Sequence, residues 1–96
     1  MEKRKPHYDL AGVQRGADAF TATALTGVQA MGLDSAQAVN VVCSMRRSDF
    51  FKSMTTHASS QIWQDVYRPV APNGKVAYVK VTLRVDGSVV IQFKEK

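Results

Sequence analysis

Apolar and polar residues alternate without interruption between Ala77 and Val85, and this pattern leaves few folds open to the chain. The odd-numbered positions hold Ala, Val, Val, Leu and Val, whereas the even ones hold Tyr78, Lys80, Thr82 and Arg84. Because successive side chains of a strand point to opposite faces, the pattern predicts a strand over Val76–Val85 with one dry and one wet face. A similar alternation predicts a second strand over Val89–Lys94.

The hairpin between these two strands has two possible turns. A two-residue turn at positions 86–87 would place Phe93 opposite Lys80 and mix the faces. A three-residue turn at 86–88 keeps the apolar set on one face, so the pattern favours it. It predicts the pairs Val85 with Val89, Leu83 with Ile91, Lys80 with Lys94, and Tyr78 with Lys96. Lysines directly opposite are mildly destabilising, which suggests that they serve a phosphate site.

The first half of the chain has helical periodicity. Asp34 and Gln37 have the spacing of a capping box, which predicts a helix that continues to about Arg46. Thr21 or Thr23 is a suitable cap for a preceding helix that ends at Gly32. A shorter helix is predicted over Asp9–Ala17.

Two further strands are predicted over Phe50–Thr55 and Gln61–Arg68, where β-branched and aromatic residues concentrate. Helices therefore come first and strands second. This order predicts a single α+β domain over residues 1–96, with N-terminal helices packed on one face of an antiparallel sheet.

Cysteine content and hydropathy limit the kinds of site and the cellular locations that the chain can have. Cys43 is the only cysteine among 96 residues, so no disulfide can form within the chain and a multi-cysteine zinc site is excluded. A reducing cytoplasm is the natural location, and Cys43 is expected to be a small buried residue on a helix. No apolar run is long enough for a membrane helix, and no secretory signal is visible.

The excess of positive charge lies entirely in the second half of the chain. Residues 1–45 carry four basic and four acidic side chains, whereas residues 46–96 carry nine basic and four acidic ones, which accounts for the whole net charge of +5. A basic face on a small sheet suggests a polyanion such as RNA or DNA. The alternative is a surface that is merely solvated.

Standard catalytic motifs are absent. The sequence has no P-loop, no GxSxG, no HExxH and no cluster of carboxylates of the kind that holds Mg²⁺. The remaining chemistry is metal-free handling of a phosphodiester, in which an RNA 2′-hydroxyl attacks the adjacent phosphorus. Lysine, arginine, tyrosine and glutamine can stabilise the charge, and His57 or a lysine with a depressed pKa can transfer protons.

Four segments carry a resemblance to a known family. They are Met1–Arg4 with Pro6-His7, the run SDFFKSMTT at 48–56, the run IWQDVYRP at 62–69, and FKEK at 93–96. Together they resemble the motility quorum-sensing regulator (MqsR) toxins. Residues 14–44 match that family only in length and helical character, and His57 stands where a tyrosine is expected.

The resemblance implies a RelE-like α+β fold and a sequence-selective endoribonuclease that cuts mRNA at GC-containing sites. It implies no metal and no other cofactor. The implied partner is a cognate MqsA-like antitoxin with a zinc-binding module and a DNA-binding module. An open strand edge would offer that antitoxin a docking point.

The resemblance also assigns residues. The family's catalytic positions map to Lys52, Gln64, Tyr78 and Lys94. Lys52 and Lys94 would hold the scissile phosphate, Gln64 would position the ribose or phosphate, and Tyr78 would transfer a proton near the leaving oxygen. Further RNA contacts are expected from Lys80, Arg68, Lys96 and His57.

Two other functions remain open at this point. The chain could be a non-catalytic regulator that binds RNA or DNA on the same scaffold, or an interaction subunit whose basic face is only solvated. RNA cleavage in excess EDTA separates the ribonuclease from both.

Overall fold

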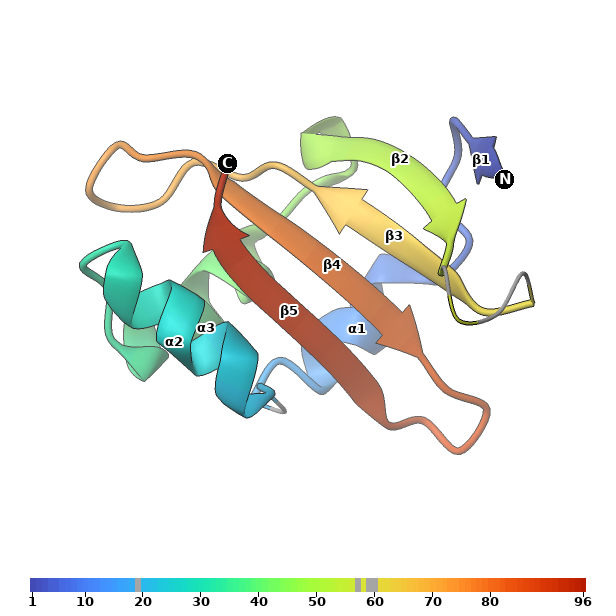
Figure 1. Ribbon diagram of the computed structural model, residues 1–96, viewed down its shortest axis with the longest axis horizontal. Coiled ribbons are helices and arrows are strands. Elements are labelled where there is room, and N and C mark those ends of the chain that lie inside the picture. Colours follow the sequence, from blue (N-terminus) through green and yellow to red (C-terminus); the bar gives the residue numbers. More distant parts are fainter. Residues whose placement is uncertain (19, 57, 59–60) are drawn as a thin grey trace.

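A computed structural model describes residues 1–18, 20–56, 58 and 61–96 of the chain. Its elements are β1 (Glu2–Lys3), α1 (Leu10–Arg15), α2 (Ala22–Ala30), α3 (Ser35–Ser44), a 3-10 turn (Arg47–Asp49), β2 (Phe50–Thr55), β3 (Trp63–Tyr67), β4 (Ala77–Leu83) and β5 (Val89–Glu95). The strands form one antiparallel sheet in the order β1-β2-β3-β4-β5 (Figure 1). The predicted α+β class is confirmed, and the arrangement is consistent with a RelE-like fold.

The helix boundaries follow from their caps. Gln37 N donates to Asp34 Oδ1 at 2.8 Å and Asp34 N donates to Gln37 Oε1 at 3.0 Å, so the predicted capping box begins α3. Thr21 Oγ1 accepts from the backbone N–H of Ala24 and begins α2. The prediction that α3 continues to Arg46 was wrong. Met45 is extended, and Arg46 N instead donates to the Asp49 carboxylate in the 3-10 turn.

The core lies between the sheet and the helices. The inward face of the two C-terminal strands supplies Val79, Val81, Ile91 and Phe93, and the helices supply Val13, Val28 and Val42; all are buried. Figure 1 shows α1 and α3 behind the sheet and α2 beside β5. The opposite side of the sheet carries the polar alternation and no described helix covers its centre. We call this side the open face.

The outer edge of β5 is covered by the chain from Phe20 to Gly27. Phe20 forms a backbone bridge with Ile91, and Thr21 Oγ1 donates to the Ile91 carbonyl at 3.4 Å. A Cβ atom on Gly27 would overlap the carbonyl oxygen of Phe93, so only glycine lets α2 approach this closely. α2 therefore forms a fixed wall along one side of the open face, and this edge of the sheet is closed to further strands.

The predicted register of the last hairpin was wrong by two residues. β4 and β5 pair Leu83 with Val89, so the connection has five residues, and Val85 is fully exposed rather than opposite Val89. Asp86 Oδ1 accepts from both the N–H and the hydroxyl of Ser88, which holds the loop in its own turn. Because the shift is even, every side chain keeps its predicted face. The pairs change, however: Tyr78 lies opposite Lys94, and Lys80 lies opposite Gln92.

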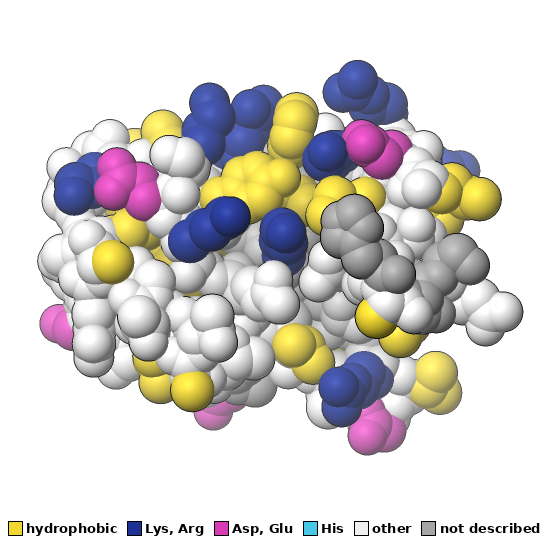
Figure 2. Space-filling view, in the orientation of Figure 1, with side chains coloured by type: hydrophobic (Ala, Val, Ile, Leu, Met, Phe, Trp, Pro, Cys, Tyr) yellow, Lys and Arg dark blue, Asp and Glu magenta, His cyan; other side chains and the backbone are white. Residues whose placement is uncertain are grey.

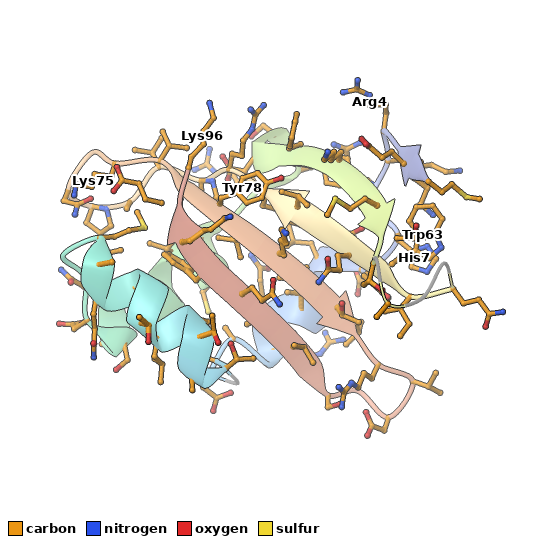
Figure 3. The ribbon with its side chains drawn as sticks, viewed as in Figure 1. Arg4, His7, Trp63, Lys75, Tyr78 and Lys96 are labelled. Atoms are coloured by element: carbon orange, nitrogen blue, oxygen red, sulfur yellow. The ribbon has the colours of Figure 1, made fainter. Side chains whose placement is uncertain are left out.

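The N-terminal segment is anchored by one buried carboxylate. The Asp65 side chain is fully buried and accepts the backbone N–H groups of His7, at 3.0 Å, and Tyr8, at 2.8 Å. The Tyr8 hydroxyl donates to the Trp63 carbonyl, and the His7 ring stacks on the Trp63 ring at 5.3 Å (Figure 3). These contacts hold β1 against β2. β1 was not predicted from the sequence, because a strand of two residues has no periodicity.

Cys43 and Tyr67 differ in how far they are buried. Cys43 is exposed, so the prediction that it is buried was wrong. Tyr67 is completely buried, and its hydroxyl has no hydrogen-bond partner among the described residues. Burial, and secondarily the charge of Asp65, raises the pKa of Tyr67 to about 12. This phenol therefore stays protonated at neutral pH and belongs to the scaffold.

Candidate functional site

Cationic side chains gather on the open face around an aromatic patch. Figure 2 shows several Lys and Arg side chains around a hydrophobic area in the upper part of this face. The residues that come together are Lys52 of β2, Arg68 after β3, Tyr78 and Lys80 of β4, and Lys94 of β5. We call them the basic cluster. Five of the eight predicted site residues are thus neighbours, although they are up to 42 positions apart in sequence.

Strand pairing positions the cluster in rows. One row crosses the sheet from Lys52 through Val66 and Lys80 to Gln92. The adjacent row contains the pair Tyr78 and Lys94. Side chains directly opposite each other on neighbouring strands lie within contact distance on the same face. Lys80 therefore has cationic neighbours in both rows.

Tyr78 lies at the centre of the cluster. Its ring centroid is 5.6 Å from Lys94 Nζ and 5.8 Å from Lys80 Nζ, and 6.5 Å from the Phe51 ring centroid. The Arg68 guanidinium covers the other aromatic ring, 3.8 Å from the Phe51 centroid. Cation–π contacts of this kind hold the charges near the rings. Two ammonium groups thus lie within 5.8 Å of the centre of the Tyr78 ring.

Within the described part of the chain, Lys52 is the only residue of the basic cluster that forms an ion pair with an acidic side chain. Its Nζ lies 3.2 Å from Glu2 Oε1, and the side chains are 21% and 60% exposed. An exposed ion pair contributes about 0–1 kcal/mol, so a phosphate can replace Glu2 at little cost. Glu2 therefore holds Lys52 in place without blocking it.

The environment of the basic cluster changes the pKa of Lys80. Burial first, and then the charges of Lys94 and Lys52, lower the pKa of the Lys80 ammonium from its usual 10.5. The folded state thus binds this proton less tightly than the unfolded chain does. Lys80 consequently costs stability at neutral pH, and the cost disappears as the pH rises through the lowered pKa towards 10.5. A bound anion would remove the same cost.

Replacing Lys80 should therefore stabilise the fold while it weakens anion binding. For Lys80→Gln we expect a gain of about 0.5 kcal/mol at pH 7, which is the size of an interaction between largely exposed charges, or roughly 2–4 °C in Tm. The gain should shrink as the pH approaches 10.5. Thermal unfolding at pH 7 and pH 10 measures both values. The matched control is Lys75→Gln, because Lys75 is exposed and lies outside the cluster. A lower Tm for Lys80→Gln at pH 7 would contradict the argument.

The other predicted site residues lie around the cluster. Gln64 is half-buried opposite Met54 and, with Thr82 and Arg84, lines a hollow of about 500 Å³. Lys96 lines a shallow groove with Tyr78 and Lys94. His57 lies outside the described residues. Gln64 is therefore one row further along the sheet than Lys52 and Lys80.

Three contributors to the site were not predicted. Phe51 packs between Arg68 and Tyr78, and Gln92 lies beside Lys80. Thr23 of α2 reaches the same region. The alternation of the hairpin already placed Gln92 on the polar face. The shift of the register by two residues then brings Gln92 opposite Lys80. No sequence signal placed α2 beside β5.

These features define a class of protein: a small α+β domain whose open sheet face gathers lysines and an arginine around a tyrosine. Among the residues that the structure describes, no three His, Cys, Asp or Glu side chains come together to hold a metal ion. None of the described helices is long and apolar enough to cross a membrane.

Comparison with known proteins specifies the family. Residues 5–95 match the family described as "Motility quorum-sensing regulator, toxin of MqsA". The chain is also 42% identical, over 100 aligned positions that cover all of both chains, to the "mRNA interferase toxin MqsR" of Escherichia coli (strain K12). The chain therefore belongs to the MqsR toxin family, as its sequence segments predicted.

Proposed function

We propose that this chain is an mRNA interferase, an endoribonuclease toxin that cuts messenger RNA. The observation that carries the proposal is the placement of Lys52, Lys80 and Lys94 around Tyr78 on one open face. The name of the Escherichia coli relative supports the same activity.

The proposed reaction is an internal transesterification. The RNA 2′-oxygen forms a bond to phosphorus, the bond from phosphorus to the 5′-oxygen breaks, and a 2′,3′-cyclic phosphate and a 5′-hydroxyl result. Lys52 and Lys94 bind the phosphate and stabilise its developing charge. Gln64 positions the ribose or the phosphate.

Two proton transfers complete the reaction. The 2′-hydroxyl loses a proton, and Lys80 is the described group best suited to accept it, because its lowered pKa increases its neutral fraction. The leaving 5′-oxygen gains a proton from Tyr78, whose ring centroid lies 5.6 Å from Lys94 Nζ and 5.8 Å from Lys80 Nζ.

The finer parts of the proposal extend the resemblance. We propose cleavage at GC-containing sites, no requirement for a metal, and a cytoplasmic location. The partner is an antitoxin with zinc-binding and DNA-binding modules; the family description names MqsA. Because α2 covers the edge of β5, the edge formed by β1 and β2 is the one left for strand pairing.

An RNA-cleavage assay in excess EDTA tests the activity. The purified chain should cut single-stranded RNA as fast with EDTA as without it, and the products should carry 2′,3′-cyclic phosphate ends. RNA binding without cleavage would instead favour a non-catalytic regulator. If the chain binds neither RNA nor DNA at low salt, the alternative of an interaction subunit with a solvated basic face is supported. Expression should arrest growth, and co-expression of the neighbouring reading frame should restore it.

A further inference from the structure

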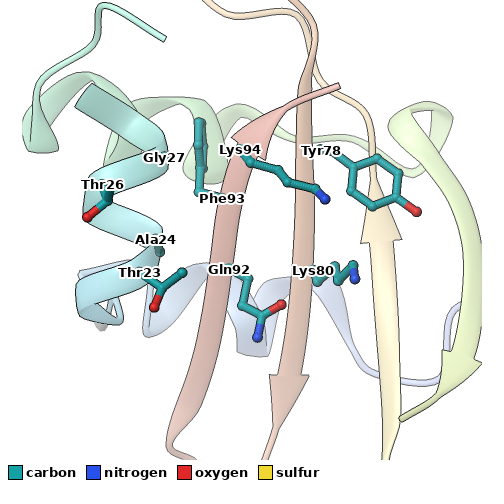
Figure 4. A pocket seen from close by; sticks show the side chains of 9 residues that line it. All are labelled: Thr23, Ala24, Thr26, Gly27, Tyr78, Lys80, Gln92, Phe93 and Lys94. Atoms are coloured by element: carbon teal, nitrogen blue, oxygen red, sulfur yellow. The ribbon is translucent and has the colours of Figure 1, made fainter. Parts of the chain in front are cut away.

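A hollow of about 390 Å³ lies between α2 and the basic cluster (Figure 4). The sheet contributes Tyr78, Lys80, Gln92 and Lys94 to its lining, and α2 contributes Thr23 and Thr26. Its volume lies within the range of pockets that bind small molecules. The hollow thus shares three residues with the proposed cleavage site and extends away from it towards the edge of the sheet.

The polar groups of this hollow are available to a ligand. Within the described part of the chain, the Gln92 carboxamide and the Thr23 hydroxyl form no hydrogen bond, and both residues are exposed. Figure 4 shows Gln92 between Thr23 and Lys80. The Thr26 hydroxyl donates to the Ala22 carbonyl at 3.2 Å, which leaves its oxygen free to accept. A carboxamide presents a donor beside an acceptor, as the edge of a nucleobase does.

The rest of the lining is apolar and rigid. Ala24 and Phe93 are buried, and Gly27 packs directly on the backbone of β5, so the wall cannot move inward. A nucleobase has apolar faces and a polar edge. The accessible surface for its faces is the half-buried Tyr78 ring and the aliphatic parts of Lys80 and Lys94, and its edge would point towards Gln92 and Thr23. Unstacked bases of single-stranded RNA are commonly bound in this way.

We propose that this hollow binds one base of the RNA next to the scissile phosphate, and that Gln92 and Thr23 read the edge of that base. The inference rests on the proposed ribonuclease function and adds a specificity subsite to it. Charge places the RNA here: Lys80 and Lys94 line both the hollow and the phosphate site. A nucleotide that is held by these lysines has a neighbouring base within reach of Gln92.

The test compares cleavage-site preferences. Wild type, Gln92→Leu, Thr23→Val and the control Gln29→Leu are incubated with a pool of random-sequence single-stranded RNA, and the cut ends are sequenced. Gln29 is the matched control because it is an exposed glutamine on α2 that does not line the hollow. Gln92→Leu should reduce the base preference at one position beside the cut by roughly 5- to 100-fold. Preferences at the other positions should remain, and Gln29→Leu should match wild type.

The outcomes separate the subsite from the activity. If the wild type leaves the pool intact, the ribonuclease function is wrong and the subsite falls with it. If the wild type cuts but Gln92→Leu and Thr23→Val keep its sequence profile, only the subsite is wrong. A uniform slowing at every site by Gln92→Leu also contradicts the subsite, because it would place Gln92 at the phosphate. Equal thermal unfolding of the variants verifies that they are folded.

Discussion

Lys94→Ala and Lys52→Ala should each reduce RNA cleavage by about 10²–10³-fold while the protein stays folded. In the proposed reaction each ammonium group meets charge that develops on the phosphate, and such preorganised groups usually make the largest single contribution to catalysis. Neither substitution should damage the core, because Lys94 is exposed and the Lys52 ammonium contacts the exposed Glu2 and the Phe51 ring on the open face. Cleavage rates at saturating RNA, with Tm as the check on folding, measure the effect.

Lys75→Ala is the matched control for these two variants. Lys75 is also an exposed lysine, paired with Glu95 at 3.7 Å, but Figure 3 shows it away from Tyr78. It should therefore weaken RNA binding slightly through net charge and leave the saturated rate unchanged. If Lys52→Ala or Lys94→Ala retains the wild-type rate, that residue does not belong to the catalytic site. Equal losses for all three lysines would point to general electrostatic attraction instead.

Much of the fold was predictable because local signals agreed with each other. Asp34 and Gln37 specify a cap by their spacing, and alternation assigns the faces of β4 and β5. The errors arose where a local contact competed with the pattern. The hydrogen bonds between Asp86 and Ser88 stabilise a longer loop, so the register differs from the predicted one by two residues. The hydrogen bond from Arg46 N to Asp49 stabilises a 3-10 turn, so α3 ends before Arg46. Neither effect changes the hydrophobic pattern, so periodicity alone cannot detect it.

The residues that share the open face were more predictable than the shape of the surface around them. Lys52, Tyr78 and Lys94 share the open face, as alternation and family resemblance together predicted. The hollow beside them depends on α2 reaching the edge of β5. That contact joins residues about 70 positions apart, Thr21 and Ile91. A glycine at position 27 makes it possible, but one glycine in a helix does not identify the strand that it will contact.

Asp65→Ala should release the N-terminal segment and destabilise the whole fold. The substitution removes the acceptor of the His7 and Tyr8 backbone N–H groups. Two hydrogen bonds to a carboxylate contribute about 3 kcal/mol together, which is a large part of the 5–15 kcal/mol typical of a domain. We therefore expect Tm to fall by more than about 10 °C. β1 should separate from β2, and Glu2 should no longer hold Lys52.

Two local measurements distinguish this anchor from a general loss of stability. Trp63 is the only tryptophan and lies under His7 and Lys3, so its fluorescence should shift to the red below the unfolding temperature. Trypsin should cut after Arg4 before it cuts elsewhere. Asp65→Asn keeps one carbonyl acceptor, so its Tm should lie between those of wild type and Asp65→Ala. Asp18→Ala removes an exposed carboxylate and should behave as wild type. If Asp65→Ala keeps the wild-type Tm and its resistance to trypsin, Asp65 does not anchor the segment. If Tm falls while the Trp63 fluorescence of the folded protein stays unchanged, the stabilisation comes from packing around Asp65 and not from its hold on the N-terminus.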